Sequence, residues 1–318
     1  HINRSSSMLT RGQAIGIDGH FMIEQAARSW NSLFMNFNGT AGMFRISAIE
    51  DAGGWQHDTL TEDMDLSYRL QLAGWKAEFL PELPVPAEIP EDVNAFKSQQ
   101  FRWASSMQTA IKIGPRLFKR KDVSIFKKIQ AMLHLTHYCV HPLMLAMIIL
   151  TLPMLTFVHI HLPLPFFVVF IFAIILASSG PSFMYMVSQH FLGQKKRRLL
   201  LKIPVLMVIG TGLVINNTKA VLEAVMNKTS PFIRTPKKGA KKGFVYSSIK
   251  DFMFLLELLV GVYCAFTAYL YLGYDNAFIS PFLVLYMSGC LFMGMLSLFH
   301  TFLPVLIDFK LPFAKERD

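Results

Sequence analysis

Three carboxylates lie within four positions of the segment "LTEDMDLSYRL", residues 60–70: Glu62, Asp63 and Asp65. A pattern typical of a helix follows them directly. Carboxylates at such a place stabilise the positive end of a helix, and Thr61 could cap it. Asp63 and Asp65 also form a short Asp-x-Asp pattern of the metal-binding kind, and a single carboxylate within reach of a hydroxyl can act as a general base. The stretch alone leaves these three interpretations open.

Two further segments could bring chemistry to the same place. The loop "FNGTAG", residues 37–42, precedes the carboxylates, and its glycines would allow a close approach of backbone to a ligand. The segment "QQFRW", residues 99–103, follows them and lies just before the first apolar stretch. The carboxylates are therefore one of three separated groups that the fold could bring together.

The first part of the chain, residues 1–129, has the pattern of a compact α/β domain. Helices are predicted at "IDGHFMIEQAARSW", at "TEDMDLSYRLQLAGW" with Gly74 as its end, and from Glu91 and Asp92 past Trp103. Short strands are predicted in "FNGTAGMFRI" and at the start of "KAEFLPELPVPAEIP". These elements would place the carboxylates at a helix start and the glycine loop before a strand.

The rest of the chain, residues 130–318, has the composition of a membrane domain. The chain is 53% hydrophobic and only 16% charged, and its apolar residues gather in stretches of about 20 residues, near bilayer length. An integral membrane protein follows from this pattern. Four spans are predicted: residues 130–158, 164–188, 251–272 and 280–304.

The charges of the chain are distributed unevenly between the two parts. Residues 1–103 contain 13 acidic and 8 basic side chains, and residues 104–318 contain 8 acidic and 23 basic ones. The basic residues flank the apolar spans, as cytoplasmic loops do, instead of forming a face interleaved with aromatic residues. This arrangement favours a membrane partner and argues against nucleic acid.

The segment 199–215 is apolar but has basic segments on both sides. A single crossing would place those two segments on opposite sides of the membrane, so we predict a re-entrant or interfacial segment. The loop that follows, residues 216–250, would then be cytoplasmic.

Two other features could carry chemistry within the membrane domain. His134, His137 and His141 are spaced to share one helix face, where they could hold a metal, line a polar path or meet lipid headgroups. Glu257 lies inside a predicted span, where an ionisable residue is either functional or extends to the interface.

Taken together, "FNGTAG", "DAGGW…TEDMDLSYRLQLAGW" and the Gln-x-x-Arg-Trp pattern at residues 99–103 resemble the membrane-bound, inverting glycosyltransferases of family 2. The similarity is greatest to cellulose-synthase-like glucomannan and mannan synthases and weaker to bacterial cellulose synthase. It runs from about residue 14 to residue 240. Phe232, Thr235 and Lys237 in "PFIRTPKKG" match most of the gating-loop pattern of such synthases, although Arg234 replaces the usual valine.

The resemblance implies the C-terminal half of a GT-A catalytic domain, with an α-helical multi-pass membrane domain after it. In the Thr61-Glu62-Asp63 motif, Asp63 would be the general base that takes the proton of the acceptor hydroxyl. Glu62 and Asp65 would then serve positioning and capping, and the family's metal motif would lie before residue 1. This implies that the chain starts partway through a longer protein, that no metal ligand lies within it, and that Mg²⁺ or Mn²⁺ is bound mainly by the preceding half.

The same resemblance assigns roles to the other motif residues. Arg102, assisted by Gln99, would hold the leaving diphosphate, because a guanidinium can grip phosphate oxygens with two hydrogen bonds. Trp103 would offer a flat face on which the acceptor sugar stacks. The acceptor site would be bordered by Asn38, Gly39 and Thr40. For Arg102 the simpler alternative is a surface ion pair, and for Trp103 it is an ordinary buried aromatic.

We therefore expect a glycosyltransferase that moves a sugar from a nucleotide-diphosphate donor, UDP-glucose or GDP-mannose, to a growing β-linked polysaccharide and translocates the product. The catalytic domain would be cytoplasmic, with the bacterial inner membrane as the expected location. A single transfer to a lipid acceptor and a non-catalytic membrane transport subunit are the two alternatives.

Overall fold

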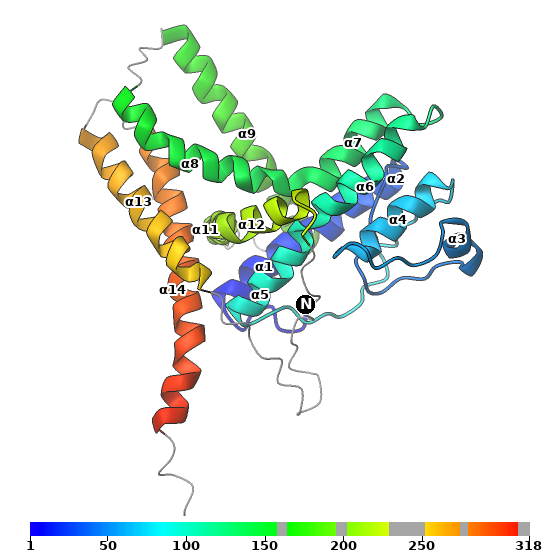
Figure 1. Cartoon of the computed structure of the whole chain (residues 1–318), viewed down its shortest axis with the longest axis horizontal. Helices are drawn as coiled ribbons and strands as arrows, with labels where there is room; N and C mark the ends of the chain where they lie inside the picture. The colour runs from blue at the N-terminus through cyan, green and yellow to red at the C-terminus, as the bar shows by residue number, and fades with distance from the viewer. Residues whose placement is uncertain (158–163, 195–201, 229–251, 274–278, 311–318) are drawn as a thin grey trace, which may run out of the picture.

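The structure is a computed structural model that describes residues 1–157, 164–194, 202–228, 252–273 and 279–310. In Figure 1 the long helices α8, α9, α13 and α14 lie on one side of the molecule, and the shorter helices α2, α3, α4, α6 and α7 lie on the other. The helices α1, α5, α11 and α12 occupy the region between these two groups.

The chain begins with one nearly continuous helical segment, which contains the helix predicted at residues 17–30 and starts nine residues earlier. It consists of α1 (Met8–Gly19), the π-helical turn η1 (His20–Gln25) and α2 (Ala26–Trp30). Ser7 caps α1, because its side chain accepts a hydrogen bond from the Thr10 N–H and its own N–H donates one to the Thr10 hydroxyl. The π-helical turn is of interest because such turns frequently occur at functional sites.

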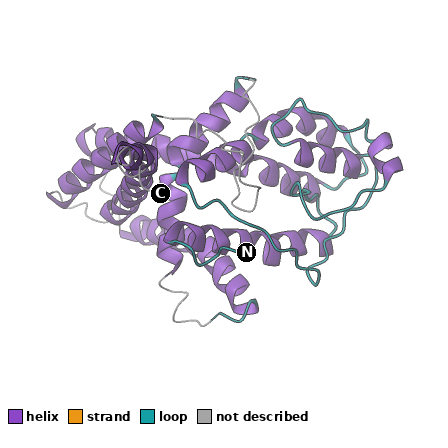
Figure 2. Ribbon diagram, turned by 90° about the horizontal axis from the view of Figure 1, so that it is seen from below, coloured by secondary structure: helices purple, strands orange, loops and turns teal. Residues whose placement is uncertain are grey.

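The strands predicted in the first part of the chain are absent, which corrects the sequence analysis. No residue of the described part forms a strand, as Figure 2 also shows. Extended backbone needs a neighbouring strand to complete its hydrogen bonds. Here side chains take that place: the N–H groups of Met35, Phe37 and Phe79 donate to Gln71, Ser67 and Ser29.

The predicted helix that follows the carboxylates is confirmed as α4 (Glu62–Leu72). Gly74 comes directly after its end and adopts φ +98°, a conformation that glycine reaches without strain. The short helix α3 (Ile46–Asp51) packs against α4 through a small apolar cluster. The helix that carries the carboxylates therefore has a defined C-terminal end and is packed against α3.

The predicted helix beginning after Asp92 is α5 (Val93–Ala104), and the Asp92 carboxylate caps it by accepting a hydrogen bond from the Ala95 N–H. It ends at Ser105, where α6 (Ser106–Lys119) begins. Next comes α7 (Ile125–Thr136), capped by Ser124. The expected domain boundary at residues 129 and 130 falls within α7.

The remaining helices form the apolar part of the molecule. They are η2 (His137–Cys139), α8 (Val140–Phe157), α9 (Leu164–Phe191), α11 (Lys202–Gly212), α12 (Val214–Val225), α13 (Met253–Gly273) and α14 (Ser280–Lys310).

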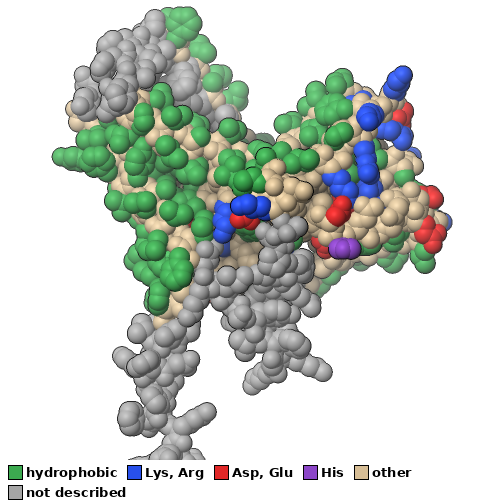
Figure 3. Space-filling view, in the orientation of Figure 1, with side chains coloured by type: hydrophobic (Ala, Val, Ile, Leu, Met, Phe, Trp, Pro, Cys, Tyr) green, Lys and Arg blue, Asp and Glu red, His purple; other side chains and the backbone are tan. Residues whose placement is uncertain are grey.

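Three stretches of the described chain are long and apolar enough to cross a membrane: Ile125–Leu155, Met253–Gly273 and Ser280–Phe302. They match three of the four predicted spans. Large apolar side chains are exposed along α13, and Figure 3 shows hydrophobic side chains covering this side of the molecule. The expected span 164–188 is a single helix here, α9, and its crossing of a membrane stays a prediction.

The pair α11 and α12 covers the segment predicted to be re-entrant or interfacial. The two helices meet at a break with a bend of 45°, a geometry compatible with a broken span or with a re-entrant loop. Of the predicted cytoplasmic loop 216–250, the first part belongs to α12 and residues 229–251 lie outside the described residues.

Helix α5 lies between the two parts of the molecule and packs against both. Val93 and Phe96 join a core with residues of α1, α11 and α14, while Ala104 packs against α12. A row of polar contacts reinforces this packing: the Val93 N–H donates to His300, and Asn94 donates to Thr301. The helix that carries the Gln-x-x-Arg-Trp pattern is thus attached to α14.

A buried ion pair completes this attachment. The Lys97 ammonium on α5 lies 2.6 Å from the Glu257 carboxylate on α13 and donates a hydrogen bond to Ser297 on α14. The side chains of Lys97 and Glu257 are 5% and 0% exposed. Glu257 therefore points inward to a cation, and the alternative that it extends to the membrane interface is wrong.

Replacing one partner of this pair should destabilise the protein more than replacing both. Lys97→Met leaves the Glu257 carboxylate buried without its cation, which typically costs about 3–5 kcal/mol, whereas an apolar replacement of both partners is often nearly neutral. We expect Lys97→Met to lower the unfolding temperature in detergent and Lys97→Met/Glu257→Leu to recover most of the loss. Lys119→Met, at an exposed position of α6, is the control and should change little. A double variant that is less stable than Lys97→Met would contradict the pairing.

Candidate active site

At the start of α4, neither Thr61 nor Asp63 acts as a helix cap. Thr61 stands at the cap position, but its side chain makes no capping hydrogen bond and instead shares one with Thr109 of α6 at 3.0 Å. The predicted cap is therefore wrong, and Thr61 fixes α4 to α6. Asp63 accepts a hydrogen bond from the Met64 N–H at 2.8 Å, which leaves its other oxygen, Oδ2, pointing toward Gly39.

The glycine loop reaches the Asp63 carboxylate. A Cβ atom added to Gly39 would lie 3.0 Å from Asp63 Oδ2, and Gly39 adopts φ +74°. Both the space and the backbone conformation therefore favour glycine at this position. The sequence placed Gly39 and Asp63 in separate motifs, and the structure brings them into contact.

The surroundings of Asp63 favour its protonated form. Burial raises the pKa of the Asp63 carboxyl to about 6, and the neighbouring charge of Glu62 acts in the same direction. The Met64 N–H and the Arg102 guanidinium oppose this rise. An acid with a pKa of about 6 holds a proton more readily than an exposed aspartate, which is the property that a general base needs near neutral pH.

Arg102 and Gln99 are one turn apart on α5. Arg102 is half-buried, and burial lowers the pKa of its guanidinium while Glu62 and Asp63 act to raise it. These two carboxylates are therefore close enough to interact with its charge. Gln99 has a buried side-chain oxygen without a hydrogen-bond partner in the described structure. The structure thus brings Arg102 to the Glu62–Asp63 end of α4.

Trp103 follows Arg102 and is 37% exposed, so it is not an ordinary core aromatic. Gly39 and Thr40 are also exposed, and Asn38 is half-buried. The Asn38 side-chain oxygen faces His20 Nε2 at 3.1 Å and accepts from Asn36 Nδ2 at 3.0 Å. The polar and flat surfaces predicted to meet the acceptor are therefore accessible, whereas their binding of a sugar stays a prediction.

Asp65 differs sharply from Asp63, although only one residue separates them. It is fully buried, and its carboxylate contacts Arg69 Nε at 2.7 Å and Lys112 Nζ at 3.1 Å. Arg69 also donates to the Gly54 carbonyl, so the pair connects α4, α6 and the turn after α3. This arrangement contradicts both capping and a shared Asp63–Asp65 metal site, because the two carboxylates have separate partners.

The predicted histidine face has partners of its own. His134 interacts with Tyr68, His137 with the His134 carbonyl, and His141 with Asn217. Among the described residues, no three His, Cys, Asp or Glu side chains come together in a way that could hold a metal ion. The proposed gating residues Phe232, Thr235 and Lys237 lie outside the described residues.

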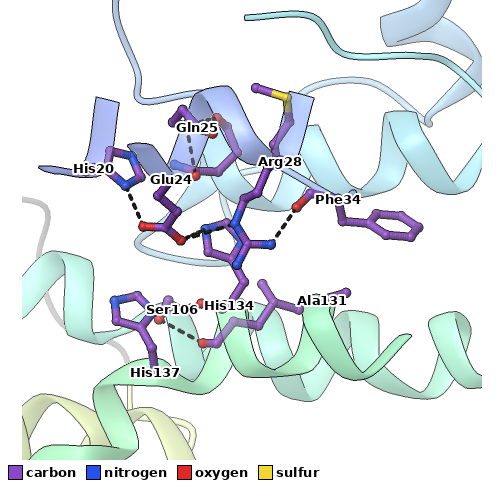
Figure 4. Close-up of polar contacts among 12 residues, drawn as sticks. His20, Glu24, Gln25, Arg28, Phe34, Ser106, Ala131, His134 and His137 are labelled. Carbon is purple, nitrogen blue, oxygen red and sulfur yellow. Dashed lines mark hydrogen bonds and ion pairs between the residues drawn. The ribbon is translucent and has the colours of Figure 1, made fainter. Parts of the chain in front are cut away.

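A polar cluster beside the site was not recognised in the sequence. It is centred on Glu24, which Figure 4 shows between His20 and Arg28, with His134 of α7 opposite. Burial alone would raise the pKa of the Glu24 carboxyl, but the hydrogen bond from His20 and the nearby His20, His134 and Arg28 side chains hold it well below its usual value. The spacing of His20, Glu24 and Arg28 at every fourth residue was the available signal.

Comparisons with known proteins show the family of the chain. The sequence profile of the glycosyl transferase family group 2 matches residues 3–178. Probable glucomannan 4-beta-mannosyltransferase 7 of Oryza sativa subsp. japonica is 43% identical over 128 residues, 40% of this chain and 22% of the relative. Probable glucomannan 4-beta-mannosyltransferase 15 of Arabidopsis thaliana is 41% identical over 128 residues, 40% of this chain and 24% of the relative.

The chain thus spans about a quarter of the length of these curated relatives. No solved structure shows a significant match to it.

The buried position of Asp65 predicts a loss of stability on Asp65→Asn. The substitution keeps the shape of the side chain but leaves Arg69 and Lys112 without their shared anion, and breaking a buried pair in this way typically costs about 3–5 kcal/mol. Thermal unfolding of the purified protein measures the effect, with Glu50→Gln at an exposed position as the control. An unchanged unfolding temperature would mean that Asp65 does not anchor α4.

Proposed function

Because the chain belongs to the glycosyl transferase family group 2, we propose that it carries the catalytic base and the acceptor-side surface of a membrane-bound, inverting glycosyltransferase. The observation that carries this proposal is Asp63, a carboxylate of raised pKa between a glycine loop and a half-buried arginine. A GT-A fold of the catalytic domain, which the family implies, is part of the proposal.

In the proposed reaction an acceptor hydroxyl attacks the anomeric carbon of the donor sugar. The new glycosidic bond forms as the bond to the diphosphate breaks, and the configuration at that carbon inverts. Asp63 takes the proton of the attacking hydroxyl. Arg102 holds the departing diphosphate, on which negative charge increases during the reaction. Gly39 leaves room for the acceptor beside the base.

We further propose that the acceptor is a growing β-linked polysaccharide and that the product leaves across the membrane along the apolar helices. The names of the relatives favour mannosyl transfer in 1,4-linkage, which makes GDP-mannose the first donor to test and UDP-glucose the second. A bound Mg²⁺ or Mn²⁺ ion would neutralise the diphosphate. The described residues bring no set of ligands together for it, so none of the steps above relies on the metal.

Asp63→Asn in the full-length enzyme should abolish most turnover while donor affinity stays nearly unchanged. The amide preserves the size of the side chain but cannot accept the proton, and general bases typically contribute about 10²–10⁴-fold. The base must be ionised to act, so the rate of the natural enzyme should fall as the pH decreases through about 6, the pKa of Asp63. Rates with radiolabelled donor at several pH values test both points.

The control for this experiment is Glu62→Gln, which removes a neighbouring charge that raises the pKa of Asp63. In this variant the acidic limb of the rate profile should move to lower pH. Full turnover by Asp63→Asn, or an acidic limb that Glu62→Gln does not move, would contradict the assignment of Asp63 as the base.

Trp103→Ala should weaken acceptor use and shorten the products, while donor binding is preserved. Aromatic stacking contributes about 0.5–1.5 kcal/mol in aromatic pairs, and we expect a similar gain on a sugar face. Product length and the KM for a short β-linked acceptor measure this effect, with Trp30→Ala at another exposed tryptophan as the control. A loss of donor affinity with normal acceptor use would contradict the role of Trp103. If the only product is a glycolipid, the acceptor is a lipid and not a polysaccharide.

A further inference from the structure

The cluster around Glu24 connects four parts of the protein: η1, the glycine loop, α7 and α4. The Glu24 carboxylate accepts hydrogen bonds from His20 Nδ1 at 3.0 Å and from Arg28 Nε at 3.1 Å, and His134 Nε2 lies 3.8 Å from it. Hydrogen bonds that involve ionised groups are stronger than neutral ones. A carboxylate with two such hydrogen bonds and a third polar neighbour is therefore an anchoring point on η1.

One branch of the cluster leads to the glycine loop. The two ring nitrogens of His20 bridge Glu24 and the Asn38 side chain, at 3.0 Å and 3.1 Å. Asn38 precedes Gly39, the residue whose backbone lies against the Asp63 carboxylate. His20 thus reaches the base through two consecutive residues of the loop, Asn38 and Gly39.

One residue of the loop other than glycine has an unfavourable backbone conformation. Gly39 has φ +74° and Ala41, which has a side chain, has φ +58°. Residues other than glycine adopt such values at a cost of order 1–3 kcal/mol and persist only where the surrounding structure holds them. The bridge from His20 and the hydrogen bond from Asn36 supply this constraint at Asn38.

A second branch leads to the helix that carries the base. His134, which faces Glu24 through Nε2, also interacts through Nδ1 with the Tyr68 hydroxyl at 2.7 Å. Tyr68 is fully buried on α4, five residues after Asp63, and stacks on Phe34. The same cluster therefore contacts both the loop that faces the base and the helix that carries it. His134 belongs to α7, the start of a candidate membrane span.

We propose that His20 and Glu24 are positioning residues for the transfer reaction. They hold Asn38 and Gly39 against the Asp63 carboxylate, and through His134 they fix this arrangement to the first candidate span. The proposal rests on the proposed function, because it assumes that Asp63 is the base. It assigns to His20 and Glu24 no contact with the donor, so their replacement changes the rate of transfer and leaves donor affinity intact.

A double-mutant cycle in the full-length enzyme tests the proposal. His20→Ala and Asn38→Ala should each lower kcat by about 10–100-fold, since a small misplacement of a catalytic group can cost about 10²-fold. Because His20 acts through Asn38, His20→Ala/Asn38→Ala should lose no more than the poorer single variant. The donor Kd should stay unchanged in all three. Glu24→Gln should lower kcat in the same way and also lower the unfolding temperature.

The control is Asn3→Ala, which removes another asparagine that connects two chain segments. Asn3 bonds to the backbone of Ile89 and contacts no residue around Asp63, so kcat should not change. Independent, additive losses of kcat from His20→Ala and Asn38→Ala would overturn the proposal, as would a fall in donor affinity that matches the fall in kcat.

The Asp63→Asn variant distinguishes a failure of the proposed function from a failure of this inference. If Asp63→Asn keeps full turnover, Asp63 is not the base and both proposals fall. If Asp63→Asn loses turnover while the losses from His20→Ala and Asn38→Ala are additive, the base assignment stands and only the positioning role is wrong.

Discussion

The buried ion pair between Lys97 and Glu257 sets the geometry on which the rest of the site depends. An ion pair removed from water is stable only when both charges are present and well placed, so it tolerates little displacement of either helix. Lys97 lies five residues before Arg102 on the same helix. A fixed Lys97 therefore sets the position of α5 along its axis and its rotation about that axis. Both determine where Arg102 meets Glu62 and Asp63.

Three carboxylates of this region illustrate how surroundings decide the role of a side chain. Asp63 has few compensating partners, and burial raises its pKa. Asp65 has two cations and makes structural contacts only. Glu24 accepts a hydrogen bond from His20 and lies beside Arg28 and His134, and these side chains lower its pKa. With a pKa of about 6, Asp63 is suited to take up and release a proton near neutral pH.

The sequence predicted the helices well because their signals are local. The cap at Asp92, the glycine after α4 and the length of the apolar stretches all depend on neighbouring residues. It failed where partners are remote. The strands were predicted from local patterns, yet the side chains that accept hydrogen bonds from Phe37 and Phe79, those of Ser67 and Ser29, lie on helices. The Lys97–Glu257 pair and the Glu24–His134 contact were beyond reach for the same reason, since no periodic pattern links residues so distant in the chain.

The contacts of α5 with α14 have a consequence for the biogenesis of the protein. Val93 bonds to His300 and Asn94 bonds to Thr301, and the members of each pair are separated by 207 positions. A ribosome adds about 5–20 residues per second, so the N-terminal end of α5 emerges many seconds before its partners exist. During that interval Lys97 lacks its counter-ion, and α5 cannot adopt its final place. The helix that carries Arg102 therefore reaches its final position only after α13 and α14 have been synthesised, so a partly synthesised chain cannot yet hold Arg102 in place beside Glu62 and Asp63.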